Sequence, residues 1–89
     1  MPTVFMPTRF HKRVHSWSKE DQKQLAAFQL AVEALGWDAL LSYPFCLIQD
    51  VRLSASGDIG EMDFWLKIRM DYVHLTLELR LPEIFVLHD

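Results

Sequence analysis

Two stretches near the end of the chain alternate strictly between apolar and polar residues. The apolar positions are Phe64, Leu66, Ile68 and Met70 in the first stretch, and Val73, Leu75, Leu77 and Leu79 in the second. Strict period two places one apolar set on one face of a sheet and one polar set on the other. The pattern therefore predicts two half-buried antiparallel strands, in which a slip of one residue would exchange the faces.

A short loop at residues 71–72 would join these strands and set their register. The inward pairs would then be Met70 with Val73, Ile68 with Leu75, Leu66 with Leu77, and Phe64 with Leu79. The outward pairs would include Trp65 with Glu78 and Asp63 with Arg80, the second of which joins opposite charges. A four-residue loop with the same facing is equally compatible, because Asp-Tyr is not a usual tight-turn dipeptide.

A helix is predicted over about residues 18–35. Its apolar side is marked by residues at helical spacing, namely Leu25, Phe28, Val32 and Leu35. Ser18, followed three residues later by Asp21, resembles a capping box, with Ser16 as the competing cap. Gly36 stands where a left-handed residue commonly ends a helix.

The remaining segments complete a small α+β domain. Residues 1–15 contain Pro2 and Pro7 and are predicted as an extended arm or an edge strand. Residues 37–41 favour a short helical turn, and residues 45–53 a strand that is apolar on both sides, as in a central or doubly covered strand. A turn at 54–60 precedes the two alternating strands, and a turn at 81–83 precedes the final strand, 84–88.

The prediction is thus a single domain spanning 1–89, with one main amphipathic helix packed on a three- to four-stranded antiparallel sheet. One cysteine, Cys46, cannot form an internal disulfide, and no secretory signal pattern is present, so we expect a cytoplasmic protein. The longest uncharged run, 39–49, contains a proline and is shorter than the roughly 20 residues that a membrane span needs. We therefore expect no membrane partner.

Charge is distributed unevenly along the chain. Residues 1–23 carry five basic and two acidic residues, a balance of plus three, whereas residues 24–89 carry four basic and ten acidic residues, a balance of minus six. The overall net charge of −3 argues against the broad basic footprint of a general nucleic-acid binder. A local basic patch can still serve as a binding surface.

The polar face of the predicted sheet holds the densest group of candidate functional residues: Trp65, Lys67, Arg69, His74 and Arg80, with His88 as a further member. In a ribonuclease, His74 would act as general acid or base while Arg69 or Lys67 stabilises phosphate charge and Trp65 stacks on a base. In a binding protein, Trp65 on a polar face indicates an interface. The plain alternative is a solvated face, interrupted by acidic residues.

A second candidate surface lies near the N-terminus, where basic and aromatic residues alternate. Arg9, Lys12, Arg13 and Trp17 suit contact with an acidic partner or a phosphate backbone, and an ordinary charged edge is the alternative. His11 and His15 have the spacing of helical metal ligands, but no third ligand is signalled nearby. We therefore predict no metal site and no cofactor.

The chain resembles the RelE/HigB/ParE group of bacterial toxins along nearly its whole length. The resemblance lies in 10–17 leading into the helix, in Gly36-Trp37-Asp38-Ala39-Leu40-Leu41-Ser42-Tyr43-Pro44, in Gly60-Glu61-Met62 and in Phe85-Val86-Leu87-His88. It departs from the ribonucleases of that group at Asp63, where they usually have arginine, and after Asp89, where they continue with a basic tail. The resemblance therefore implies the α+β fold more strongly than the activity.

Two functional hypotheses follow from these residues. The first is a small non-catalytic interaction module, an inhibitor or regulator of phage or plasmid type, that binds a protein or ribonucleoprotein complex through its sheet face or its basic N-terminal segment. The second, implied by the resemblance, is an endoribonuclease that arrests translation, and only this alternative requires RNA as a partner. A homodimer is compatible with both hypotheses.

Overall fold

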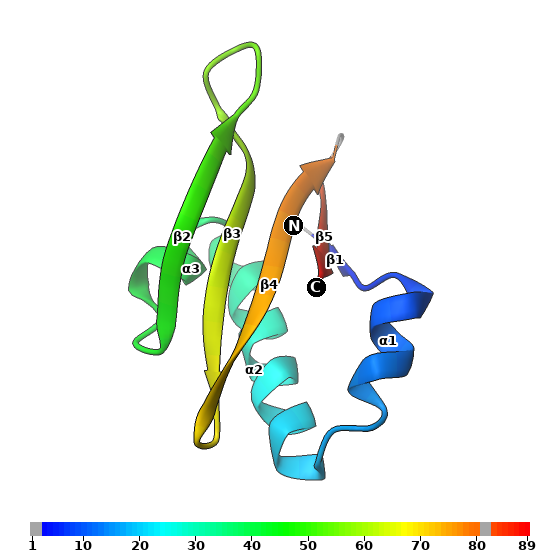
Figure 1. The fold of residues 1–89 in the computed structure, drawn as a ribbon. Coiled ribbons are helices and arrows are strands. Elements are labelled where there is room, and N and C mark those ends of the chain that lie inside the picture. The colour runs from blue at the N-terminus through cyan, green and yellow to red at the C-terminus, as the bar shows by residue number, and fades with distance from the viewer. Residues whose placement is uncertain (1–2, 81–82) are drawn as a thin grey trace.

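The computed structural model describes residues 3–80 and 83–89. Its elements, in chain order, are β1 (Thr3–Phe5), α1 (Thr8–Val14), α2 (Lys19–Leu35), α3 (Asp38–Ser42), β2 (Cys46–Leu53), β3 (Ile59–Ile68), β4 (Asp71–Arg80) and β5 (Ile84–His88). The described strands form one five-stranded sheet in the order β1-β5-β4-β3-β2 (Figure 1). The α+β class is confirmed, but the sheet is larger than predicted and not purely antiparallel, because β1 pairs with β5 in parallel.

Helix α2 forms as its sequence predicts. The Ser18 hydroxyl accepts a hydrogen bond from the Asp21 amide at 3.2 Å and caps the first turn. Gly36 ends the helix at φ 59°, a conformation that glycine adopts with little strain. Leu25, Phe28 and Val32 are buried, whereas Leu35, which was predicted on the same side, is 53% exposed.

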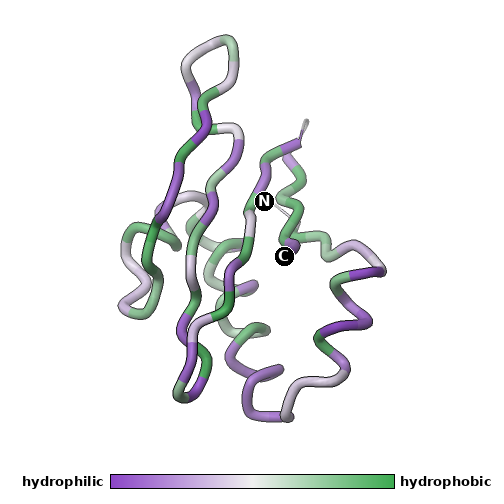
Figure 2. The backbone as a smooth tube through the Cα atoms, viewed as in Figure 1, coloured by the Kyte–Doolittle hydropathy of each residue, from purple (hydrophilic) through white to green (hydrophobic). Residues whose placement is uncertain are grey.

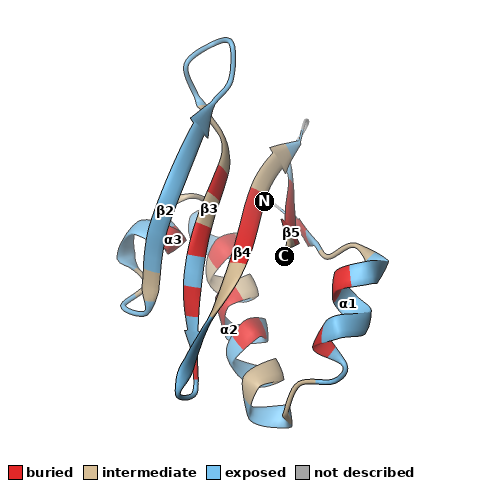
Figure 3. Ribbon diagram, in the orientation of Figure 1, coloured by how far each residue is buried: buried red, intermediate tan, exposed pale blue. Residues whose placement is uncertain are grey.

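The core lies between α2 and one face of the sheet. The rings of Phe28 and Phe64 have centroids 5.4 Å apart, which joins the middle of α2 to the middle of β3. Alternate residues of β3 are buried beside them, as the red segments of Figure 3 show: Met62, Phe64, Leu66 and Ile68. Each fully buried side chain of this size contributes roughly 1.5–3 kcal/mol. The alternation predicted for β3 is therefore confirmed.

The predicted register between β3 and β4 is wrong by four residues, because the turn lies two residues earlier in the chain than expected. Ile68 pairs with Asp71, so the turn consists of Arg69 and Met70, and residues 71–72 belong to β4. Arg69 has φ 49°, and its amide donates to the Gln24 side-chain oxygen of α2 at 3.3 Å. Met70, predicted to face the core, is 94% exposed at the tip. A register shift of four, an even number, keeps the remaining side chains on their predicted faces.

The shifted register changes the pairs on the polar face, which is called the outer face below. Trp65 lies opposite His74 instead of Glu78, and Asp63 lies opposite Thr76 instead of Arg80. The predicted ion pair between Asp63 and Arg80 is consequently not formed across these strands. Arg80 Nε instead pairs with Glu78, which lies two residues earlier on β4, at 3.0 Å.

The N-terminal segment is only partly extended. Residues 3–5 form the edge strand β1, in agreement with one predicted alternative, but 8–14 form the helix α1. Pro7 precedes α1 with φ −57°, where a proline loses no helical hydrogen bond. Phe10 and Val14, one helical turn apart, are both buried, and this packing outweighs the extended preference expected from the prolines. Met1 and Pro2 lie outside the described residues.

Strand β2 is an edge strand, which contradicts the prediction of a central or doubly covered one. Seven of its eight residues are exposed. A β-bulge between Ile48 and Asp50 places an extra residue, Gln49, in the strand and reverses the facing beyond it. Cys46 is half-buried at its start, and burial raises the pKa of the Cys46 thiol to about 11, which suits a packed side chain more than a nucleophile.

The other short elements agree with the sequence within small limits. The helical turn predicted at 37–41 is the helix α3, and the final strand matches β5. Trp37, predicted as a core residue, is half-buried and packs edge-on against Phe85, with ring centroids 5.1 Å apart. The turn predicted at 54–60 is shorter, because Ile59 already belongs to β3. Residues 81 and 82 of the last predicted turn lie outside the described residues.

Candidate anion-binding groove

The parallel pairing of β1 with β5 brings the basic N-terminal segment beside the C-terminal strand. Thr3 lies opposite Ile84 and Phe5 opposite Val86, so the chain leaves the sheet next to β5 and enters α1. Figure 1 shows α1 beside β4 and β5, away from the end of the sheet that β2 forms. Two surfaces that are far apart in the sequence therefore share one side of the molecule.

A groove of about 570 Å³ lies between α1 and the outer face of β4 and β5. It is lined by Pro7, Arg9, Phe10, Arg13, His74, Arg80, Val86, His88 and Asp89, and is called the basic groove below. Three of these nine residues are arginines and two are histidines, whereas Asp89 supplies the one carboxylate side chain. The apolar members supply the floor, since Phe10 and Val86 are both buried. An elongated polyanion matches this lining.

Ion pairs at the rim hold the groove in place. Arg13 of α1 pairs with Asp89 beyond β5, so the helix is tied to the end of the sheet. On the sheet, the Glu78 carboxylate pairs with Arg80 and lies 3.9 Å from His88 Nε2. Arg9 has no ion-pair partner within the described residues. Arg9 is therefore the arginine of the groove that is most available to an incoming anion.

The junction between α1 and α2 is also fixed by hydrogen bonds. Gln22 of α2 donates through its side-chain amide to the Val14 carbonyl at 2.9 Å and to the Trp17 carbonyl at 3.1 Å. Trp17 is half-buried and packs edge-on against Phe10, with centroids 6.1 Å apart. Trp17 was predicted to bind a partner. In the structure its side chain packs within the molecule and helps to position α1. Lys12 is exposed on α1 and is not part of the groove lining.

Trp65 lies next to the groove on the outer face. Its ring centroid is 5.1 Å from that of His74, and its indole N–H donates to the Gln49 side-chain oxygen at 3.0 Å. Trp65 nevertheless remains 39% exposed. From the sequence, the Trp65 side chain was expected to be covered either within the monomer or by a partner. In the structure Gln49 of β2 and His74 of β4 cover it in part.

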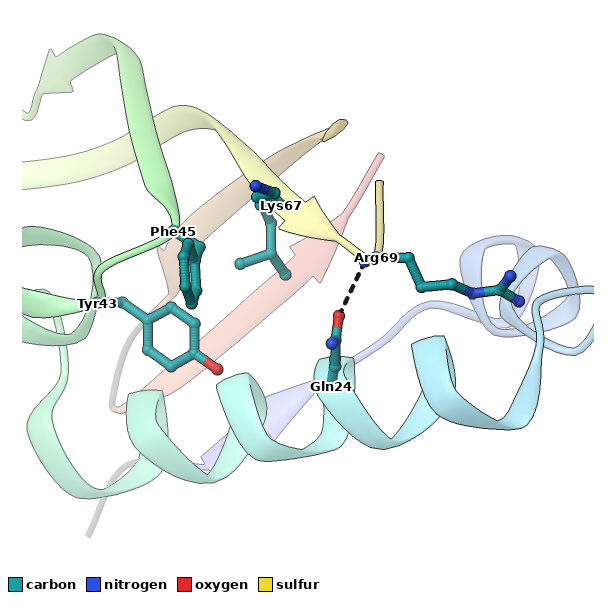
Figure 4. Close-up of a pocket in the computed structure, with 6 residues that line it drawn as sticks. Gln24, Tyr43, Phe45, Lys67 and Arg69 are labelled. Carbon is teal, nitrogen blue, oxygen red and sulfur yellow. Dashed lines mark hydrogen bonds between the residues drawn. The ribbon is translucent and has the colours of Figure 1, made fainter. Parts of the chain in front are cut away.

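Lys67 and Arg69, the other two residues of the predicted catalytic set, line a different cavity from His74. This second cavity has a volume of about 330 Å³ and is formed with Gln24, Tyr43, Phe45 and Leu66 (Figure 4). Lys67 Nζ lies 5.7 Å from the centre of the Phe45 ring, and Arg69 Nε pairs with Asp21 of α2 at 3.2 Å. His74, Arg69 and Lys67 therefore do not share one cavity.

Sequence reasoning missed the acidic neighbours of His88. Glu61, Glu78 and His88 place one ligand atom each within 4.8 Å of one another. The register explains this cluster, because Glu61 is directly opposite Glu78 and His88 is opposite Thr76. Only the correct pairing of β3, β4 and β5 would have revealed it. Cross-strand carboxylates of this kind also raise the negative potential beside the groove.

A salt-bridge network occupies the β2 and β3 half of the outer face. Arg52 pairs with Glu61 at 2.8 Å and with Asp50 and Asp63 at 3.2 Å each. The Thr76 hydroxyl also donates to Asp63 at 2.7 Å. Partial burial acts to raise the pKa of Asp63, but the hydrogen bonds from Thr76 and Arg52 and the Arg52 charge outweigh it, so this pKa lies below its ordinary value of 3.8. The outer face is therefore acidic toward β2 and basic toward α1.

Comparisons with protein-family models, with curated proteins and with solved structures find no match for this chain. Among the described residues, no helix is both long and apolar enough to cross a membrane. The geometry of the groove and the chemistry of its side chains are therefore what indicates a function.

The acidic network generates a pH-dependence prediction. Because the pKa of Asp63 is lowered in the folded state, its carboxylate stabilises the fold above its unfolded pKa, and this contribution is lost as pH falls through the folded value. The Asp63→Asn variant should therefore lose less unfolding free energy than the native chain between about pH 5 and pH 2. Urea unfolding followed by tryptophan fluorescence measures this difference.

Asp58→Asn is the matched control, because Asp58 is an exposed turn carboxylate that contacts Ser56. Both variants remove one carboxylate, so the difference between their acid profiles isolates the contacts of Asp63 with Arg52 and Thr76. An Asp63→Asn profile as steep as that of the native chain would show that Asp63 does not contribute.

Proposed function

We propose that this chain is a small non-catalytic interaction module that binds an acidic segment of a macromolecular partner in the basic groove. The observation that carries the proposal is the convergence of Arg9 and Arg13 from α1 with His74 and Arg80 from β4. The sequence offered these as separate surfaces, the N-terminal segment and the sheet face. Their union in one concavity favours a ligand long enough to contact both.

Charge supports a protein segment as the ligand more than a nucleic acid. The chain has a net charge of −3, and acidic groups surround the groove at Glu78, Asp89 and Glu61. A phosphate backbone carries charge at every step and would meet these carboxylates repeatedly. An acidic peptide can place its carboxylates at the arginines alone, and its apolar side chains against Val86 and Phe10. Such a module suits an inhibitor or a regulator.

The test uses two variants that remove the same number of positive charges. Arg9→Ala combined with Arg80→Ala removes two groove arginines, whereas Lys67→Ala combined with Arg69→Ala removes two charges at the second cavity. Fluorescence anisotropy with a labelled polyglutamate peptide measures affinity. We expect the groove variant to bind about tenfold or more weakly, since each charge-assisted contact contributes on the order of 1 kcal/mol.

The control variant should change the affinity by less than about twofold, because its charges lie outside the groove. Equal weakening by both variants would show that the peptide responds to net charge alone, which contradicts the groove as the binding site. Circular dichroism of both variants confirms that the fold is retained.

A ribonuclease is the second candidate, favoured by the pairing of His88 with Glu78 beside three arginines. In metal-free RNA cleavage, a base removes the proton of the 2′-hydroxyl and the resulting oxygen attacks phosphorus. The bond from phosphorus to the 5′-oxygen breaks, and an acid protonates that oxygen, which leaves a 2′,3′-cyclic phosphate and a 5′-hydroxyl. His74 and His88 offer the acid and base, and Arg80 and Arg9 the phosphate contacts, in place of Lys67 and Arg69.

Incubation with a short single-stranded RNA separates the two candidates. The proposed interaction module predicts that the native chain leaves the RNA intact and that His88→Ala changes nothing. Cyclic-phosphate products formed by the native chain, and lost in His88→Ala while Lys67→Ala still forms them, would establish the nuclease and refute the non-catalytic module.

A further inference from the structure

Strand β2 forms an open edge of the sheet. It pairs with β3 on one side, and no described strand lies on its other side. The opposite edge of the sheet, β1, has three residues, whereas β2 has eight. A long open edge presents a row of amide and carbonyl groups that can pair with another strand.

The side chains of β2 are apolar as well as exposed. Leu47 is 55% exposed, Ile48 39%, Val51 41% and Leu53 63%. Figure 3 shows β2 exposed along most of its length, while the neighbouring strand β3 and the next strand, β4, carry buried segments. Figure 2 shows apolar and polar segments interspersed along this strand. Apolar groups on an open edge indicate an interaction site, because a solitary monomer gains nothing from them.

We propose that β2 pairs antiparallel with β2 of a second copy of this chain, about a two-fold axis at Val51. Inside the hairpin, the Ser54 amide donates to the Asp58 carbonyl at 2.7 Å, toward β3. Backbone groups alternate in direction along a strand, so Val51 and Leu53 direct theirs to the open edge. Pairing there joins the two five-stranded sheets into one continuous sheet.

The charges around Val51 favour a second copy as the occupant. With Val51 on the axis, Asp50 of each copy lies opposite Arg52 of the other, which forms two oppositely charged cross-strand pairs. Both side chains are accessible, since Asp50 is 55% exposed and Arg52 48%. The sequence Asp50-Val51-Arg52 is therefore complementary to itself when it is read in the antiparallel direction.

The dimer leaves the basic groove free. The strand order places β2 at one end of the sheet and the β5 and β1 side at the other. Each copy would present its own groove, so a partner with two acidic segments would gain avidity. The dimer itself stands independently of the proposed ligand, because no residue of the groove takes part in it.

Sedimentation equilibrium of the native chain and of Val51→Lys tests the proposal. The native chain should show a reversible monomer-dimer equilibrium. Val51→Lys places two ammonium groups together on the axis and should raise the dimer dissociation constant at least about tenfold. Leu30→Lys is the matched control, because Leu30 is also an exposed apolar residue, at 64%, but belongs to α2 and not to the pairing strand.

Asp50→Arg provides a second variant in case Val51→Lys does not fold, as judged by circular dichroism. It sets arginine against Arg52 of the other copy and should weaken the dimer while the apolar side chains remain. A native chain that stays monomeric at all concentrations would overturn the proposal. So would a dimer that Leu30→Lys disrupts and that Val51→Lys and Asp50→Arg leave unchanged.

Discussion

The packing of α2 against β3, centred on the contact between Phe28 and Phe64, determines which residues of the sheet enter the core and which reach the outer face. It can form only if β3 presents alternate residues to the helix, and that alternation sends the intervening residues to the outer face. Trp65, Asp63 and Glu61 lie on the opposite side of the sheet for this reason. The composition of the outer face is thus a consequence of how the core is built.

The topology then divides the outer face into two electrostatic halves. Because β1 pairs with β5, the chain enters α1 next to the C-terminal strand. The arginines of α1 therefore line the same groove as His74 and Arg80. At the other end, Arg52 is surrounded by three carboxylates. The uneven charge seen along the sequence therefore persists in space, but its boundary runs across the sheet and not between two halves of the chain.

The sequence predicted those elements whose formation depends on neighbouring residues in the chain. The capping serine, the helical apolar spacing and the terminal glycine were sufficient to place α2, and strict alternation was sufficient to assign the faces of β3 and β4. The turn between them was missed because Arg69 takes a left-handed conformation that its side chain does not favour, and a contact with Gln24 helps to hold it. Since the register error was four residues, an even number, the faces were still correct.

The groove could not be predicted, because it depends on contacts between distant segments. Nothing in residues 1–15 signals pairing with β5, and the buried pair Phe10 and Val14 forms a helix only because the sheet offers a surface for it. The exposure of β2 was hidden in the same way, since a single extra residue at Gln49 reverses the facing of the strand. The sequence indicated the individual basic residues as candidates, but it did not indicate that Arg9, Arg13 and Arg80 line one groove.

If the basic groove is the binding site, one anionic ligand must contact α1 and the sheet together. Backbone amide chemical shifts of the isotope-labelled native chain, followed by nuclear magnetic resonance during titration with the polyglutamate peptide, show whether it does. We expect the amides of Arg9, Arg13, His74 and Val86 to shift in parallel and to saturate at one ligand concentration. Shifts confined to Lys67 and Arg69, or to α1 without the sheet, would contradict it.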